Sequence, residues 1–478
     1  MKSDLKQKLA ISLILACSFV GGSLPSLSMP SEAKKEPGEE KKTIVELTNP
    51  AVLSGLKLRV TGRKIVIGEG QIQAGEKLTT ISQPTKVVVP PAGFLGVTDD
   101  VVRFTDNGKP TNIAVLTKCR AALDDSAILR GVLVPDSLKV KSAPGGDAPA
   151  FTKDRDYTVD NTFGAIKLMT GGSIKPGDKV YTEYQCWRRR IDSIAFDPST
   201  EQFVLIQGVP ARSAPEPPEV ASTLIPLANV YTDWGDGDIP VTDVMPVQER
   251  EPPPNTKLIE HNRRAMAPII KKLQEGQPVH IVFWGDGVTQ GFDARSKEKT
   301  FAYLFIKQLR AAFPKASLTM SNLGIAGSNS LTRLPMVKIE VFGLKPDVVI
   351  VEFADDFTLP SHVLQKDYQV LLQAAKEKNV RVILCSPHCP APRMARAMNW
   401  EAVADRPYIP VLRELASNND FVALADVFER WEHLPKEGLH LDWLYVNGLN
   451  NPNNRGHAIY AEELMRCFAS PKIASQQQ

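Results

Sequence analysis

The distribution of hydrophobic positions divides the chain into two regions of different pattern. From residue 44 to residue 209 the apolar residues fall in short runs rich in Val, Ile and Leu, bounded by turn signals such as Pro176-Gly177-Asp178. No helical period of useful length occurs there. This pattern predicts an all-β N-terminal region, built as a sandwich or as a pair of small β units. The expected strands include 56–60, 64–67, 86–89, 128–134 and 179–185.

A proline-rich connector separates the two regions. It covers residues 210–254 and contains one more β stretch near residues 228–244. Proline-rich segments are stiff and extended, so residues 210–227 are expected to form an extended passage that leads into this β stretch. It ends at Glu251-Pro252-Pro253-Pro254, which is the clearest boundary in the chain.

Beyond this boundary, helical spacing of apolar residues alternates with short apolar runs. The alternation predicts an α/β domain over residues 255–470 with a doubly wound parallel sheet, followed by a tail, 471–478. Ligands of such folds lie beyond the carboxyl ends of the strands, here near Gly285, Asn322, Asp355 and Cys385. The expected helices are 261–273, 297–313, 331–342, 363–378, 408–417 and 457–468, and the expected strands are 279–284, 318–322, 348–353, 380–385 and 421–425.

The start of the chain has the pattern of an export signal. Lysines at positions 2, 6 and 8 precede an apolar stretch, 9–20, that is short for a membrane span. Ser31-Glu32-Ala33 offers a cleavage site, which predicts a signal peptide over 1–33 and a polar linker over 34–43. Lipidation at Cys17 and an uncleaved anchor are alternatives. The protein is expected to be exported, to the periplasm, the cell surface or the medium.

Composition and cysteine usage narrow the function classes. The net charge of +3 over 478 residues gives no reason to expect nucleic acid as a partner. After Cys17, five cysteines remain, an odd number that does not describe a disulfide framework. Cys119 and Cys186 could pair, because both lie in the β region. His388 between Cys385 and Cys389 crowds one strand end, whereas zinc ligands come from separated positions, so no metal or other cofactor is expected.

Four short blocks carry a resemblance to a known family. They are Gly285-Asp286-Gly287, the segment Asn322 to Ser328, the pair Asp355-Asp356, and the run from Asn447 to His457. With their spacing, residues 278–468 resemble an SGNH/GDSL hydrolase, which implies a flavodoxin-like fold and ester hydrolysis. In that family a serine attacks, a histidine is its base and an aspartate orients the histidine. The N–H groups of the serine and of a glycine, with an asparagine side chain, form the oxyanion hole.

The first three blocks depart from the family pattern at two landmarks. Gly287 stands at the position of the nucleophilic serine and has no side chain to deprotonate. Gly327 matches the glycine of the oxyanion hole. Asp355 stands where the family has asparagine, and an ionised carboxylate would repel a developing oxyanion. Asp356 matches an aspartate that we interpret as structural.

The last block has lost its base. Asn451 replaces the catalytic histidine, and an amide has no useful basicity near neutral pH. The orienting aspartate falls on Asn447, or on Gly448 if the spacing is one residue shorter. His457 matches a second histidine that opens the final helix, for which we expect a structural role.

Other residues could in principle rescue the chemistry. Thr289 and Ser328 carry hydroxyls near the expected pocket, and Glu437 with His440 has the spacing of an Asp-x-x-His pair. A relocated site built from them would make the protein an active carbohydrate or acyl esterase. His440 is more simply part of the connector after Trp431.

The resulting prediction is an exported pseudohydrolase whose emptied pocket binds a ligand or holds the β region. Clustered carboxylates and amides suit a carbohydrate, a similar cell-surface component, or a hard cation such as calcium. One alternative is the active esterase, and another is a surface binding or assembly protein that acts through its β region. The candidate ligand-binding residues are Asp286, Asp355, Asn447, Asn451 and Asn453.

Overall fold

A computed structural model describes residues 44–106, 108–120, 129–250, 252–291, 294, 296–389, 408–446 and 451–468. The predicted signal peptide, the linker 34–43, the tail 471–478, Cys17, Asn447 and Gly448 lie outside these residues. Among the helices that are described, none combines the length and the apolar character needed to cross a membrane.

Two segments that are distant in sequence share the first hydrophobic core. Residues 44–89 and 190–247, here called the outer β unit, bury side chains such as Leu58, Ile65 and Phe196 against each other. The antiparallel sheets have the orders β1-β3-β4-β7, β2-β5-β6 and β17-β16-β18-β19. Their strands are β1 (Ile44–Val45), β2 (Val52–Gly55), β3 (Leu58–Thr61), β4 (Lys64–Ile67), β5 (Gly70–Ala74), β6 (Lys77–Ile81), β7 (Thr85–Val88), β16 (Arg190–Asp197), β17 (Gln202–Ile206), β18 (Ile225–Thr232) and β19 (Val244–Pro246).

Residues 94–187, here called the inner β unit, form a second hydrophobic core. In sequence, this unit lies between the two segments of the outer β unit. The sheets have the orders β12-β15-β8, β11-β14-β13 and β10-β9. The prediction of an all-β N-terminal region is therefore confirmed, because both units are mainly antiparallel β. The strands are β8 (Phe94–Arg103), β9 (Thr105–Asp106), β10 (Lys109–Pro110), β11 (Ile113–Val115), β12 (Lys139–Lys141), β13 (Tyr157–Asp160), β14 (Ala165–Leu168) and β15 (Lys179–Trp187).

The strand expected over 128–134 is wrong for the part that the structure describes. Residues 129–134 contain no strand, and Leu133 makes a single bridge to Cys186. Gly131 has a φ of +79°. A residue in that left-handed region interrupts an extended strand.

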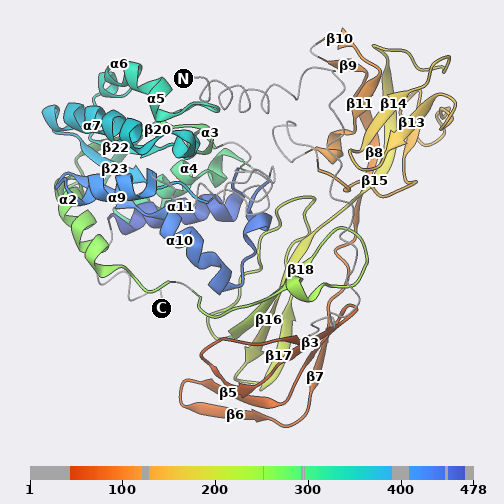
Figure 1. Ribbon diagram of the computed structural model, residues 1–478, viewed down its shortest axis with the longest axis horizontal. Helices are drawn as coiled ribbons and strands as arrows, with labels where there is room; N and C mark the ends of the chain where they lie inside the picture. Colours follow the sequence, from red (N-terminus) through yellow and green to blue (C-terminus); the bar gives the residue numbers. More distant parts are fainter. Residues whose placement is uncertain are drawn as a thin grey trace. The chain divides into compact units, whose positions relative to one another are not determined.

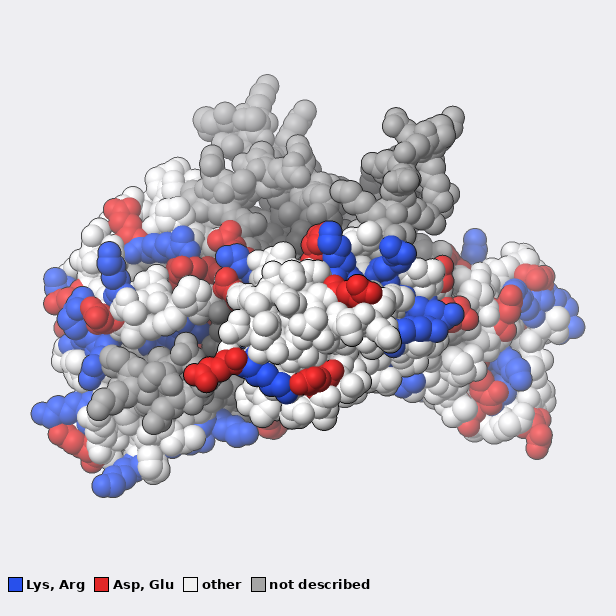
Figure 2. All heavy atoms as spheres, turned by 90° about the horizontal axis from the view of Figure 1, so that it is seen from below, with Lys and Arg blue, Asp and Glu red and all other residues white. Residues whose placement is uncertain are grey.

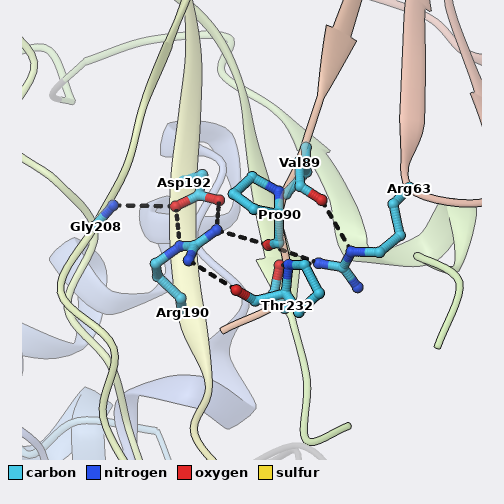
Figure 3. A network of polar contacts seen from close by, with 8 residues as sticks. Arg63, Val89, Pro90, Arg190, Asp192, Gly208 and Thr232 are labelled. Atoms are coloured by element: carbon cyan, nitrogen blue, oxygen red, sulfur yellow. Dashed lines mark hydrogen bonds and ion pairs between the residues drawn. The ribbon is translucent and has the colours of Figure 1, made fainter. Parts of the chain in front are cut away.

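A buried ion pair lies where the chain passes between the two β units (Figure 3). Arg190 and Asp192 of β16 are 4% and 0% exposed, and their side chains meet in a bidentate pair at 2.6 and 2.7 Å. The Arg190 guanidinium also donates to the Pro90 carbonyl at 2.8 Å, and Asp192 accepts from the Gly208 N–H at 3.1 Å. Arg63 donates to the same Pro90 carbonyl at 2.9 Å. The network thus links residues that precede the inner β unit in sequence with residues that follow it.

The C-terminal domain is a parallel sheet with the order β21-β20-β22-β23-β24, flanked by helices (Figure 1). Its central strand β22 is buried at all five positions, as expected for a strand covered on both faces. The predicted doubly wound fold is confirmed. The strands are β20 (Pro278–Gly285), β21 (Ser317–Gly324), β22 (Val348–Glu352), β23 (Arg381–Cys385) and β24 (Val422–Ala425).

The helices largely follow the predicted periodicity. The first begins earlier than expected, because the Asn255 side chain accepts a hydrogen bond from the Leu258 N–H and caps it. The helix expected over 331–342 is wrong as one element, since Pro335 has no N–H and the segment breaks into short turns. The helices are α2 (Thr256–Gln274), α3 (Gly287–Gln290), α4 (Phe301–Ala312), α5 (Ser330–Arg333), α6 (Val337–Glu340), α7 (Ser361–Glu377), α9 (Tyr408–Ser417), α10 (Val427–His433) and α11 (Asn454–Arg466).

Charged side chains of both signs are interspersed over the face drawn in Figure 2. This distribution agrees with the small net charge of +3.

Candidate functional site

The candidate site lies at the carboxyl ends of β20, β21 and β22. Gly285, the last residue of β20, is paired with Gly324 on one side and with Glu352 on the other. A Cβ atom on Gly285 would lie 1.9 Å from the Glu352 carbonyl oxygen, and one on Gly324 would lie 2.1 Å from the Gln290 nitrogen. Only glycine permits so close an approach of backbone to backbone. The approach brings the first, second and third blocks of the resemblance together.

Asp286 connects the first block to the third. Its side chain caps the short helix α3 by accepting from the Val288 N–H at 2.9 Å, and its other oxygen accepts from the Asp355 N–H at 2.8 Å. Burial, followed by the charges of Glu352 and Asp355, raises the pKa of Asp286 well above its usual value. Asp286 is 1% exposed, so its carboxyl group stabilises the turn through these two hydrogen bonds.

The two aspartates of the third block have different surroundings. They lie in the 3-10 helix η6 (Ala354–Thr358). Asp355 is partly exposed, and burial raises its pKa to about 6. Asp356 is buried and accepts hydrogen bonds from the Ser330 N–H at 2.8 Å and the Tyr368 hydroxyl at 2.9 Å. Burial raises the pKa of Asp356 to about 7. Asp355 can therefore face a ligand, whereas Asp356 holds the loop.

A buried polar network beneath this turn was not predicted from the sequence. The Thr289 hydroxyl donates to Glu352 Oε2 at 2.7 Å, and the Tyr460 hydroxyl lies 3.5 Å from Glu352 Oε1. Tyr460 is in turn 2.7 Å from His388 Nδ1. Burial raises the pKa of Glu352 to about 8. The available signal was one glutamate at the end of the otherwise apolar run of β22.

Two backbone N–H groups at the site have no acceptor among the described residues. They belong to Gly287, the first residue of α3, and Gly327, which follows β21. Gly327 has a φ of +73° and open space where a Cβ would stand. These are two of the three donors that the family resemblance assigns to an oxyanion hole. The third position carries Asp355, which supplies no amide.

The residues considered for a relocated catalytic site are engaged elsewhere. Thr289 is 1% exposed and bonded to Glu352, and the Ser328 hydroxyl donates to the Ile325 carbonyl at 2.7 Å. Glu437 forms a buried ion pair with Arg430. The backbone N–H of His440 donates to the Tyr231 hydroxyl of the outer β unit at 2.7 Å, and the two rings lie edge to face. The Ser328 hydroxyl is therefore bonded to the backbone, and the Thr289 hydroxyl is buried with the Glu352 carboxyl as its acceptor.

The last block lies at the start of α11. The Asn451 carbonyl accepts from the Val446 N–H at 2.9 Å, and its side chain is partly exposed. Asn453 caps α11 through the Gly456 N–H at 3.0 Å and donates to the Ala214 carbonyl at 3.4 Å. His457 is 0% exposed, with its ring stacked on Phe301 at a centroid distance of 6.1 Å. Asn453 and His457 thus contribute to packing at the helix start.

The carboxylates do not converge as a metal site. Within the described ranges, no group of three or more His, Cys, Asp or Glu side chains could hold a metal ion. The carboxyl oxygens of Asp286 and Asp356 instead accept hydrogen bonds from backbone N–H groups and, in Asp356, from a hydroxyl.

A cavity of about 480 Å³ lies away from this site, beside the edge strand β24. It is lined by residues of α2, α9 and α10 that include His261, Arg413 and Glu432. The Asp426 carboxylate in its wall is already bonded to Arg413 at 2.7 Å and to the Ser386 hydroxyl at 3.0 Å. The geometry of the family blocks, rather than cavity size, therefore identifies the candidate site.

Comparisons with known proteins agree with this assignment. Residues 283–459 match the model of the GDSL-like lipase/acylhydrolase family, which confirms the predicted family of the C-terminal domain. No curated protein matches the chain at a significant level.

Several solved structures are similar to part of the chain. A two-domain esterase active on acetylated mannans is 20% identical over 43% of this chain and 52% of its own, with a TM-score of 0.35. An acetyl xylan esterase from Geobacillus stearothermophilus is 16% identical over 40% of this chain and 94% of its own, with a TM-score of 0.34. An α/β hydrolase from the metagenome of Lake Arreo, Spain, is 20% identical over 40% and 97%, with a TM-score of 0.32. The match spans about half the length of the two-domain esterase.

Proposed function

We propose that this chain, whose residues 283–459 carry a GDSL-like lipase/acylhydrolase domain, is an exported pseudohydrolase. In this proposal it binds a carbohydrate or a similar hydroxyl-rich ligand and does not cleave esters. The observation that carries the proposal is Gly287 at the nucleophile position, because glycine has no group that can attack a carbonyl. The nearby hydroxyls of Thr289 and Ser328 are held in other hydrogen bonds. Export is inferred from the basic and apolar pattern of residues 1–33.

Two further positions support the loss of hydrolysis. Asn451 at the base position cannot take a proton from a nucleophile near neutral pH. Asp355, with a pKa of about 6, is mostly ionised at pH 7 and would face a developing oxyanion with negative charge. Loss of one oxyanion donor alone costs about 3–4 kcal/mol of transition-state stabilisation. Catalysis of the family type would therefore be slow even if another nucleophile were supplied.

The same groups suit a sugar. The N–H groups of Gly287 and Gly327 can donate, and the Asp355 carboxylate can accept. A sugar hydroxyl is both donor and acceptor, so it can be matched by such a mixture without carrying charge. Hydrogen bonds to an ionised group contribute about 1.5–3 kcal/mol each. Asp355 is accordingly the residue expected to contribute most to affinity.

A second function is suggested by contacts between the β region and the segment that leads to the last block. The Asn229 side chain and the Tyr231 hydroxyl of β18 donate to the Gly438 carbonyl at 2.9 and 3.0 Å. Arg189 lies over the ring of Trp443 with 4.6 Å to the centroid. The segment that leads to Asn451 is therefore held by the β region. The alternative proposal is that the site supports the β region. In that case the β region itself acts as the surface binding or assembly part of the protein.

The purified protein is expected to hydrolyse p-nitrophenyl acetate no faster than buffer. A Gly287→Ser/Asn451→His variant, assayed beside it, supplies the missing nucleophile and base, and any gain in rate shows that the fold can still present them. Thr289→Val is expected to leave the rate of the unaltered chain at background. Turnover by the unaltered protein that disappears in Thr289→Val would instead establish a relocated active site.

Titration calorimetry tests the binding half of the proposal. Heat is expected with xylan or mannan oligosaccharides at pH 8 and much less at pH 5, because Asp355 is protonated below its pKa of about 6. Asp355→Asn should lower affinity at pH 8 by roughly tenfold and remove most of the pH dependence. Asp106→Asn, an exposed acid in β9, is the matched control and should bind normally. No heat with these sugars, or heat with calcium chloride alone, would contradict the proposed ligand class.

A further inference from the structure

Two buried cysteines face each other in the core of the inner β unit. Cys119 ends the 3-10 helix η1 (Thr117–Cys119), and Cys186 lies near the end of β15. Both are 0% exposed and both are free thiols. Their Sγ atoms are 4.0 Å apart, although the residues are 67 positions apart in sequence. The pair is therefore brought together by the tertiary fold alone.

The backbone around Cys119 holds the two thiols in this relation. The Lys118 N–H donates to the Tyr184 hydroxyl at 3.0 Å, and Tyr184 is two residues before Cys186 on the same strand. The Leu116 N–H donates to the Gly164 carbonyl at 2.9 Å. A Cβ on Gly164 would stand only 2.5 Å from the Cys119 Cβ, so that glycine packs directly against the thiol-bearing side chain. The helix η1 is thus anchored to β15 and to the β13–β14 turn.

A disulfide needs only a small further movement. The S–S bond is about 2.05 Å long, with Cβ atoms about 3.8 Å apart. Starting from 4.0 Å, rotation of the two side chains about Cα–Cβ can supply most of this approach. In the folded state, the hydrogen bond from the Cys119 thiol lowers the pKa of the Cys186 thiol.

We propose that Cys119 and Cys186 form a disulfide under oxidising conditions and so crosslink η1 to β15. This inference rests on the export part of the proposed function for its occurrence in the cell, because disulfides persist in oxidising compartments. It does not depend on whether the α/β domain binds or cleaves anything.

The reaction is ordinary thiol–disulfide exchange with a small disulfide such as oxidised glutathione. The Cys186 thiolate attacks one glutathione sulfur, which breaks the glutathione S–S bond and releases one glutathione thiolate. The Cys119 thiolate then attacks the Cys186 sulfur of the mixed disulfide and releases the second. The protein dithiol loses two electrons and two protons, and glutathione disulfide gains both as two thiols. Because both cysteines are buried in the folded state, the exchange takes place during folding or local opening.

The test uses the purified full chain, unfolded and refolded either with oxidised glutathione or with dithiothreitol. Each sample is then denatured and alkylated with N-ethylmaleimide. The oxidised sample should take up two fewer labels by intact mass, and peptide mapping should recover one crosslinked pair that contains Cys119 and Cys186. The oxidised form should also melt roughly 10 °C higher than the reduced form. Since the oxidant is supplied in the assay, the result is independent of where the cell places the protein.

Variants identify the pair. Cys385→Ser, a buried cysteine of β23, should keep the crosslink and serves as the matched control. Cys119→Ser/Cys186→Ser should show no difference in melting temperature between the two refolding conditions. Equal labelling of the two wild-type samples, or a crosslink that joins any other cysteine, would overturn the inference. Both of these outcomes are read on the wild-type chain, so they hold even if the double variant fails to fold.

Discussion

Asp192→Asn is expected to lower the free energy of unfolding of the β units by about 3–5 kcal/mol. Asp192 is 0% exposed and receives both donors of the Arg190 guanidinium at 2.6 and 2.7 Å. Removing its charge leaves a guanidinium buried against carbonyl oxygens, close to a second guanidinium from Arg63 (Figure 3). Breaking a buried pair on one side is costly because the remaining charge has been taken out of water and has no counterion.

The measurement is hydrogen exchange of the β16 amides together with urea unfolding. Glu46→Gln is the matched control, because its partner Lys57 and Glu46 itself are 58% and 64% exposed. Surface pairs of this kind contribute about 0–1 kcal/mol. Arg190→Met/Asp192→Leu removes both charges and should be more stable than Asp192→Asn. A loss with Asp192→Asn no larger than that with Glu46→Gln would show that the pair has no role at the junction of the β units.

Glu352→Gln is expected to change how the stability of the α/β domain depends on pH. Burial raises the pKa of Glu352 from 4.5 to about 8, so the folded state keeps a proton that the unfolded state loses. The stabilisation is therefore complete below pH 4.5 and is lost as pH rises through about 8. The slope in this window is about 1.4 kcal/mol per pH unit for one such group. Glutamine has no proton to lose, so the variant should be more stable than the wild type at pH 9.

Thermal unfolding at pH 5 and pH 9 measures this effect. At pH 5 the folded states of both proteins carry a neutral side chain at position 352, so the two stabilities should lie much closer together than at pH 9. Asp356→Asn provides the comparison, because burial raises the pKa of Asp356 only to about 7. Its gain over the wild type should begin at lower pH and should be smaller. Parallel loss of stability in the wild type and Glu352→Gln between pH 5 and 9 would mean that Glu352 is ionised in the fold throughout that range.

The local elements of the α/β domain were predictable because their information is local. The apolar run over β22 and the helical spacing over α9 place these elements within a residue of their observed ends. The two elements that were predicted wrongly also have local causes. Pro335 breaks the helix expected over 331–342, and Gly131 interrupts the strand expected over 128–134.

The β region shows what periodicity cannot convey. Alternation identifies the buried face of β3, but it does not say which strands share a core. The union of residues 44–89 with 190–247, and the separate core of residues 94–187, depend on pairings between distant segments. The same limit applies to Cys119 and Cys186, because the 4.0 Å between their Sγ atoms could not be predicted from their spacing in the sequence.

The sequence by itself predicted, through the family resemblance, that Gly287, Asp355 and Asn451 stand where the family chemistry needs a hydroxyl, an amide and an imidazole. That prediction uses only residue identity and the spacing of the four blocks, because glycine lacks a hydroxyl and asparagine lacks an imidazole in any fold. Only the tertiary structure decided which remaining groups are available. In the fold, the buried Asp286 carboxyl accepts a hydrogen bond from the Asp355 N–H, and the buried Thr289 hydroxyl donates to Glu352. Desolvation and hydrogen bonding depend on the segments that meet in space, which is why these roles and the raised pKa of Glu352 could not be read along the chain.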